Sequence, residues 1–270
     1  MLNPETIVER YRVEEELGRG ACAVVYRVRH TKLDSPHALK VLLWKSPALR
    51  QRMLQEGKVQ ASLQHPNVVP VTDVVELGDQ MALVMPFIDG PDLEGWLSER
   101  TISQDTAEAL FREIIAGLAA AHAQGIIHRD LKPGNILMQQ IDGRWVPRIS
   151  DFGIARLITE GATGLTRTGA AIGTPGYMAP EQFRDGHSAG VRADIWALGC
   201  IFYEMLLGRV PFQGANMAAI ELATTSGTYT PPETLNTHLP DRIKRAIRGC
   251  LVVNPDERIP DCATLLRVLD

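Results

Sequence analysis

The sequence predicts an α+β fold of two lobes, with a small antiparallel sheet in the N-terminal third and mainly helices after it. Apolar segments at residues 11–17, 24–28, 37–43, 69–76 and 81–87 indicate five strands. Downstream, apolar residues recur at helical spacing over residues 103–125. Because 270 residues leave room for a large core, we expect one two-lobed domain over residues 1–270, divided into an N-lobe at 11–87 and a C-lobe at 88–270.

The composition excludes several classes of protein. Lys and Arg total 28 and Asp and Glu total 32, so the formal net charge is −4, and without a long basic block we expect no nucleic-acid partner. The cysteines lack the Cys-x-x-Cys spacing of metal or redox motifs, which favours reduced thiols. The apolar stretch 114–127 is too short to span a bilayer, and the N-terminus lacks a signal-peptide pattern. We therefore expect a segment without membrane contact, either a cytoplasmic protein or the cytoplasmic domain of a longer, membrane-anchored one.

The first two strands are joined by a glycine-containing loop at residues 18–23, Gly-Arg-Gly-Ala-Cys-Ala. Two glycines let backbone N–H groups approach phosphate oxygens closely. Taken alone, the loop is either a tight hairpin or the cover of a nucleotide site. The next strand is apolar except for Lys40, which is either a solvated edge charge or a phosphate ligand.

Ser46 and Pro47 predict the N-cap and first turn of a helix that continues to about Leu63. The helix carries Glu56, which is either part of a solvated face or a carboxylate partner for Lys40. Gly57 follows directly and should cost about 1 kcal/mol of helix stability relative to alanine.

The long helix over residues 103–125 leads to the loop at residues 128–135, His-Arg-Asp-Leu-Lys-Pro-Gly-Asn. The carboxylate of Asp130 can orient a hydroxyl nucleophile and take its proton, and the ammonium of Lys132 can stabilise a transferred phosphoryl group. Asn135 can supply an oxygen to Mg²⁺. The loop therefore predicts phosphoryl transfer. A short strand at 136–138 and a second strand ending at residue 150 lead on to Asp151.

In this order and spacing the motifs resemble those of the protein kinases, specifically the eukaryotic-like (Hanks-type) serine/threonine kinases of bacteria, from about Tyr11 to the C-terminus. The shared motifs are the Gly-rich loop, Lys40, Glu56, the H-R-D loop, D-F-G at 151–153, A-P-E at 179–181 and D-x-W-x-x-G at 194–199. Ala23 stands where the family has a third glycine. The resemblance implies a bilobal kinase fold, with a five-stranded sheet and one helix over a mainly helical lobe and with ATP in the cleft.

The resemblance also implies roles for individual residues. The ATP site would include Gly18, Gly20, Ala23, Val25, Ala38, Lys40, Met85, Pro86, Ile88 and Asp92. For Asp92 the alternative is that it only caps the helix starting near Leu93. The catalytic residues would be Lys40, Glu56, Asp130, Lys132 and Thr174, with Asn135 and Asp151 as ligands of Mg²⁺, or of Mn²⁺ in its place.

The segment from Asp151 to Glu181 resembles a complete activation segment. Thr166 and Thr168 match the threonine pair that bacterial kinases of this type often phosphorylate, and Arg129 and Arg156 could receive the phosphate. The alternative is a pair of exposed loop threonines without a role.

Three further residues have structural roles in the family. Glu181 pairs with Arg258 there, and Asp194 accepts hydrogen bonds from the backbone at His128 and Arg129.

Gln60 falls where the family has an apolar side chain. We hypothesise that the helix carrying Glu56 is held loosely and needs a partner or loop phosphorylation for activity, and a raised basal rate in Gln60→Leu would support this. The alternative is a tolerated polar residue at the rim.

The resulting expectation is an active ATP-dependent serine/threonine protein kinase that acts on protein substrates, phosphorylates its own activation loop and forms a kinase–kinase dimer for activation. Two alternatives belong to other classes. A pseudokinase would bind nucleotide or partners without turnover, but such proteins typically lack the equivalents of Lys40, Asp130, Asn135 or Asp151, all present here. A small-molecule phosphotransferase of related fold usually lacks the A-P-E segment.

Overall fold

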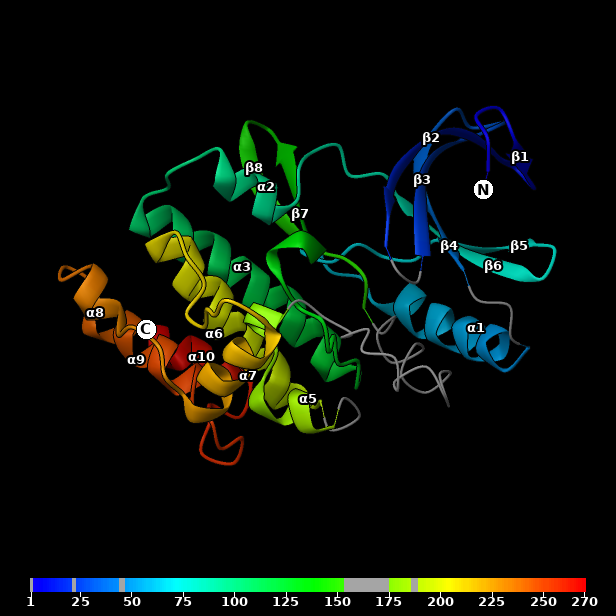
Figure 1. Ribbon diagram of the computed structural model, residues 1–270. Helices are drawn as coiled ribbons and strands as arrows, with labels where there is room; N and C mark the ends of the chain where they lie inside the picture. Colours follow the sequence, from blue (N-terminus) through cyan, green and yellow to red (C-terminus); the bar gives the residue numbers. More distant parts are fainter. Residues whose placement is uncertain (1, 21–22, 44–46, 153–174, 186–188) are drawn as a thin grey trace. The chain divides into compact units, whose positions relative to one another are not determined.

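The computed structural model describes residues 2–20, 23–43, 47–152, 175–185 and 189–270 (Figure 1). It divides into two compact units, Met1–Asp89 and Gly90–Asp270. The sequence places this boundary after residue 87 and so assigns Ile88 to the second lobe, whereas the structure includes it in the first unit. Each unit has its own core and is described by itself.

The first unit is built on a six-stranded antiparallel sheet in the order β1-β2-β3-β4-β6-β5. The strands are β1 (Ile7–Val8), β2 (Tyr11–Arg19), β3 (Ala23–His30), β4 (Pro36–Leu42), β5 (Asp73–Leu77) and β6 (Gln80–Pro86). The sheet has one strand more than the predicted five, because β1 pairs with the start of β2 through Ile7–Arg12 and Val8–Tyr11. Two residues are too few to show the alternation that marks a strand in sequence.

The two faces of this sheet have different neighbours. One face carries a buried apolar cluster that includes Val13, Val28 and Leu39. On the other face, a Cβ at Gly57 of α1 (Pro47–Ser62) would lie 3.2 Å from Val74 Cγ2 and 3.4 Å from Leu83 Cδ2. The glycine that weakens the helix therefore also lets the helix approach the sheet closely.

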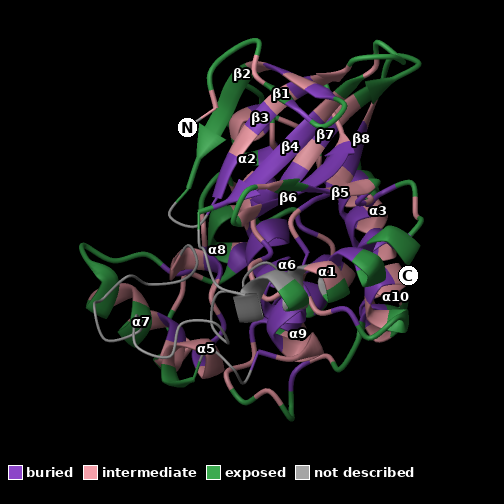
Figure 2. Cartoon of the chain, turned by 90° about the vertical axis from the view of Figure 1, so that its right-hand side faces the viewer, coloured by how far each residue is buried: buried purple, intermediate pink, exposed green. Residues whose placement is uncertain are grey.

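The second unit contains most of the helices. They are α2 (Leu93–Ser98), α3 (Gln104–Ala123), α5 (Pro180–Arg184), α6 (Val191–Leu207), α7 (Met217–Ser226), α8 (Pro232–Leu235), α9 (Asp241–Cys250) and α10 (Cys262–Leu269), with the 3-10 turns η1 (Pro133–Asn135) and η3 (Pro175–Tyr177). A hairpin of β7 (Ile136–Ile141) and β8 (Arg144–Ile149) follows η1. In Figure 2, α7 is mostly exposed or intermediate, whereas the central strands β4 and β6 are mostly buried.

Helix α6 forms the core of the second unit. It is apolar on nearly all sides, and Ile195, Trp196 and Leu198 are fully buried. The rings of Phe202 on α6 and Phe111 on α3 stack at a centroid distance of 4.0 Å. The sequence predicts this burial from the all-round apolar pattern, and α6 therefore offers a rigid base for the loops that contact it.

In the described part of the chain, no helix is both long enough and apolar enough to cross a membrane.

Candidate active site

Two predicted catalytic residues, Asp130 and Lys132, meet the predicted metal ligand Asn135 on the loop between α3 and β7. Lys132 Nζ lies 3.7 Å from Asp130 Oδ2. Asn135 Nδ2 donates to the main-chain oxygen of Asp130 at 2.7 Å and to its Oδ2 at 3.3 Å. The Asp130 and Lys132 side chains are 29% and 26% exposed, so a substrate can still reach them. The carboxylate is thus oriented by an amide and lies beside a cation, as a group that accepts a hydroxyl proton requires.

The carboxylate of Asp194 fixes the backbone of this loop through hydrogen bonds. Asp194 lies in the first turn of α6, is 1% exposed, and accepts the N–H of His128 at 2.8 Å and of Arg129 at 2.9 Å. Arg129 has φ 68°, a left-handed conformation that costs a residue other than glycine about 1–3 kcal/mol. Two hydrogen bonds to one buried carboxylate offset this cost, and the next residue is Asp130.

The β7–β8 hairpin brings Asn135 next to the residue before Asp151. Ser150 donates its N–H to the main-chain oxygen of Asn135 at 2.9 Å and its hydroxyl to the same atom at 3.1 Å. The buried His128 ring donates to the Ser150 carbonyl at 2.8 Å and lies 4.8 Å from the Phe152 ring between centroids. Asp151 has φ 65°, so this turn too is held in a strained conformation by its neighbours.

Asn135 and Asp151 fit a hard divalent cation by their chemistry. The Asn135 amide nitrogen is used by Asp130, which leaves Oδ1 as the atom that could bind a cation. Asp151 adds a carboxylate from the adjoining turn. Carboxylate and carboxamide oxygens are ligands that Mg²⁺ accepts while it keeps several waters or substrate oxygens.

In the first unit, several predicted ATP residues share one face of the sheet. Cross-strand pairs join Val25 to Lys40, Lys40 to Leu83, and Ala38 to Met85. Because side chains alternate between faces along a strand, these residues point to the same side. This is the face against which Gly57 of α1 packs. Lys40 is 8% exposed, and a buried ammonium in a strand is rare unless it is paired.

The remaining predicted ATP residues lie at the ends of the strands. Gly20, directly after β2, donates its N–H to the carbonyl of Ala23, the first residue of β3, at 2.9 Å. A Cβ at Gly18 would meet no atom of the described chain within 4 Å, so the backbone there is open to a ligand. Pro86 ends β6 opposite His37, and Ile88 is buried two residues later.

Asp92 caps a helix, which the sequence analysis gives as the alternative to a contact with ribose. Its Oδ1 accepts the N–H of Gly95 at 2.8 Å, which caps α2. A contact with ribose stays a prediction.

Several predicted residues lie outside the described residues. These are Thr166, Thr168, Arg156 and Thr174, and with them the phosphorylation and phosphate-pocket predictions that depend on them. Glu56 lies on α1, but its side chain is likewise outside the description.

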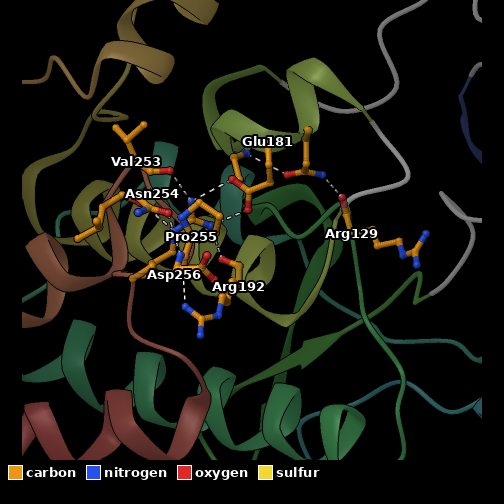
Figure 3. A network of polar contacts seen from close by, with 11 residues as sticks. Arg129, Glu181, Arg192, Val253, Asn254, Pro255 and Asp256 are labelled. Carbon is orange, nitrogen blue, oxygen red and sulfur yellow. Dashed lines mark hydrogen bonds and ion pairs between the residues drawn. The ribbon is translucent and has the colours of Figure 1, made fainter.

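Arg129 and the predicted Glu181–Arg258 pair belong to one network (Figure 3). Arg258 donates to both carboxylate oxygens of Glu181, at 2.8 and 3.0 Å, and its side chain is fully buried. The guanidinium also donates to the Arg192 carbonyl at 2.6 Å and lies 5.0 Å from the centroid of the Trp196 ring. In Figure 3 the Arg129 guanidinium points away from this network, and among the described residues no ion pair involves it.

Sequence reasoning missed several residues that support the loop. Gln182 accepts the Ala179 N–H with Oε1 and donates its Nε2 to the Arg129 carbonyl at 2.9 Å. Tyr177 donates its hydroxyl to Glu204 at 2.6 Å, and burial raises the pKa of Glu204. His122 lies on α3 and contacts Asp194; a histidine within an apolar helical repeat was the signal that could have found it.

A family model and several known proteins match nearly the whole of this chain. A family model for the protein kinase domain matches residues 11–267. The serine/threonine-protein kinase PkaA of Streptomyces coelicolor is 39% identical over 275 residues, covering 96% of this chain and 49% of the relative. PknE of Mycobacterium tuberculosis, also named a serine/threonine-protein kinase, is 36% identical over 259 residues, covering 94% and 44%.

A solved structure is similar as well. The crystal structure of Rad53 residues 1–466 in complex with AMP-PNP gives a TM-score of 0.80 at 27% identity, covering 97% of this chain and 66% of that chain. The chain spans about half the length of the curated relatives that it matches, 49% of PkaA and 44% of PknE.

Proposed function

Because this chain belongs to the protein kinase domain family, we propose that it is an ATP-dependent serine/threonine protein kinase. The observation that carries the proposal is the cluster of Asp130, Lys132 and Asn135, in which a partly exposed carboxylate lies beside an ammonium and accepts from an amide. The names of relatives at 36–39% identity support the serine/threonine class, and Lys132-Pro133 favours it as well.

The residues would divide the reaction between them. Asp130 would orient the acceptor hydroxyl and take its proton as the oxygen attacks the γ-phosphorus of ATP. Lys132 would stabilise the charge on the transferred phosphoryl group. Lys40 would hold the α- and β-phosphates, with Glu56 as its partner. Mg²⁺ held by Asn135 and Asp151 would neutralise charge on the phosphates.

Several residues would contact the adenine, the ribose and the phosphates of ATP. Val25, Ala38, Met85 and the main chain at Pro86 and Ile88 would contact adenine, and Asp92 would reach the ribose beside its capping bond. Gly18, Gly20 and Ala23 would cover the phosphates. The related Rad53 structure contains AMP-PNP, and this supports ATP as the phosphoryl donor.

The finer proposals concern acceptors and regulation. We propose protein hydroxyls as acceptors, with Thr166 or Thr168 among them, and Arg129 with Arg156 as the pocket for the resulting phosphate. Thr174 would form hydrogen bonds with Asp130 and Lys132. A second copy of the chain would form a dimer with the first and assist its activation. A cytoplasmic location, where ATP is abundant, fits this function.

Autophosphorylation is tested by mass spectrometry of the purified chain after incubation with ATP and Mg²⁺. We expect phosphate on Thr166 or Thr168, and none when a chelator removes the metal. The matched control is Asp130→Asn incubated in the same way, which should stay unmodified. Active enzyme that carries phosphate on neither threonine would contradict the prediction for the loop, and incorporation that persists in Asp130→Asn would contradict the role of Asp130.

A further inference from the structure

Arg27 of β3 contacts two parts of the first unit that lie on opposite sides of its strand. Its Cζ lies 4.7 Å from the centroid of the ring of Phe87, the residue that directly follows β6. On the opposite side, Arg27 Nε lies 3.0 Å from Glu14 Oε2 and Nη1 lies 3.5 Å from Glu15 Oε1, both on β2. Because the strand order is β2-β3-β4-β6, this one side chain links β2 to the end of β6 across β4.

The contact with Phe87 lies on the face of the sheet that carries the proposed adenine residues. Arg27 is paired across the strands with Ala38, and Ala38 is paired with Met85. Residues directly opposite each other point to the same face of a sheet. Val25, two residues before Arg27, points to that face as well. The guanidinium and the Phe87 ring therefore lie beside the residues proposed to contact adenine.

The Arg27 guanidinium is held in position by its partners. The Arg27 and Glu14 side chains are 33% and 24% exposed, so their ion pair is partly shielded from water. A guanidinium over an aromatic face is attracted by the ring electrons, and its plane can stack on the ring. Phe87 lies in the chain between Pro86 and Ile88, so a restraint on its ring also restrains the main chain on both sides.

We propose that Arg27 is a positioning residue for ATP, which holds the Phe87 ring and so fixes the main chain at Pro86 and Ile88 where adenine would bind. The inference rests on the proposed function, since it concerns the proposed adenine contacts. A main chain that is already ordered loses less conformational freedom on binding, and the affinity is higher for that reason. Arg27 therefore acts on the adenine end of the nucleotide, and neither on its phosphates nor on the acceptor hydroxyl.

Binding of adenosine, ADP and the non-hydrolysable analogue AMP-PNP tests the proposal without turnover. Isothermal titration calorimetry measures the dissociation constant of each ligand. Arg27→Ala should raise all of these constants by the same factor, about threefold or more, because each ligand contains adenine. A variant that binds adenosine as tightly as the wild type would overturn the proposal. This includes a variant in which only ADP and AMP-PNP bind more weakly, since Arg27 would then act on the phosphates.

Arg29→Ala is the matched control. Arg29 lies two residues further along β3, pairs with the same carboxylate of Glu14, and donates to the main-chain oxygen of Asp34. This variant should bind all the ligands as the wild type does. A loss equal to that of Arg27→Ala would show that the charges along β3, and not the contact with Phe87, set the affinity, and it would overturn the proposal.

A double-mutant cycle tests the contact itself. Phe87→Leu keeps an apolar side chain but removes the aromatic face, and it should weaken adenosine binding about as much as Arg27→Ala does. The double variant should bind no more weakly than either single variant, because each change already removes the same contact. Arg27→Lys keeps the charge without the planar guanidinium and should bind adenosine with intermediate affinity. Losses that add in the double variant would overturn the proposal.

Kinetics separate positioning from a general loss of structure. Arg27→Ala should raise the KM for ATP by the factor measured for binding and leave kcat within about twofold of the wild type. A sheet that is merely destabilised would lower the concentration of folded enzyme, and the apparent kcat would then fall while the KM stayed unchanged. That result would overturn the proposal.

Failure of this inference is distinguishable from failure of the proposed function. A wild-type chain that binds neither adenosine nor AMP-PNP overturns the proposed function. A wild type that binds both, beside an Arg27→Ala variant that binds both equally well, overturns only the role of Arg27.

Discussion

At the scale of single residues, Arg258 is a charged group that is fully buried and has several hydrogen-bond partners. Its side chain has no exposed surface, and it donates to Glu181 and to the carbonyls of Arg192 and Val252. Every one of these acceptors would lose a donor if the guanidinium were removed. The ion pair therefore joins α5, α6 and the loop before α10 into one body.

Arg258→Ala should lower the free energy of unfolding by about 3–5 kcal/mol, because it leaves the Glu181 carboxylate without its partner. Arg144→Ala is the control, since the Arg144–Glu113 pair lies at the surface, with Arg144 65% exposed, and should change stability by no more than about 1 kcal/mol. Urea unfolding measures both. Equal effects of the two substitutions would show that burial does not set the strength of the pair.

The ionisation of Asp73 should make the folding stability of the first unit depend on pH. Burial alone would raise the pKa of Asp73, but hydrogen bonds from Arg10, Tyr11 and the Val74 N–H outweigh it and hold the pKa below its ordinary value. A carboxylate with a lowered pKa stabilises the folded state above its unfolded pKa, and this contribution is lost as the pH falls through the folded value.

The stability difference between the wild type and Asp73→Asn should therefore be largest near neutral pH and shrink below about pH 4, near the ordinary pKa of an aspartate. Urea unfolding of both proteins from pH 7 to pH 3 measures it. A difference that stays constant or grows on acidification would contradict the lowered pKa.

At the scale of elements, the packing of α6 against α9 depends on a glycine. A Cβ at Gly199 would lie 2.5 Å from Cys250 Cβ and 3.0 Å from Leu251 Cδ2. Real carbon atoms do not approach so closely, so a side chain here would force the helices apart. The D-x-W-x-x-G motif thus ends in glycine for a reason of packing, while its aspartate serves the catalytic loop.

Gly199→Ala should lower the free energy of unfolding by about 1–3 kcal/mol or more, as overpacking of a close-packed core does. Gly190→Ala is the control, because a Cβ there would meet no atom of the described chain within 4 Å. Thermal unfolding compares the two. A Gly199→Ala protein as stable as Gly190→Ala would show that α6 and α9 can separate without cost.

Elements also show which contacts the sequence could predict. The Glu181–Arg258 pair and the hydrogen bonds of Asp194 were predicted through the family resemblance, which assigns both partners of each contact. Strand β1 was not predicted because Ile7 and Val8 are too short a pattern. The His122–Cys262 contact was not predicted either, since neither residue has a local pattern that points across 140 positions.

At the scale of the whole molecule, the proposed catalytic groups are divided between the two units. Lys40 and Glu56 belong to residues 1–89, whereas Asp130, Lys132, Asn135 and Asp151 belong to residues 90–270. The sequence analysis places the division after residue 87, because the strand-rich and helix-rich parts differ in apolar periodicity. The second unit holds the groups proposed to act on the acceptor hydroxyl, Asp130 and Lys132.

The account as a whole depends on Asp130 as the group that accepts the hydroxyl proton. Its most direct test is transfer of labelled γ-phosphate from ATP with Mg²⁺ to the chain itself and to a generic basic protein, beside Asp130→Asn. We expect the wild type to transfer label and the variant to be slower by about 10²–10⁴-fold, the usual contribution of a general base, while nucleotide binding stays unchanged. A variant as fast as the wild type, or a wild type that binds ATP and transfers nothing, would contradict it.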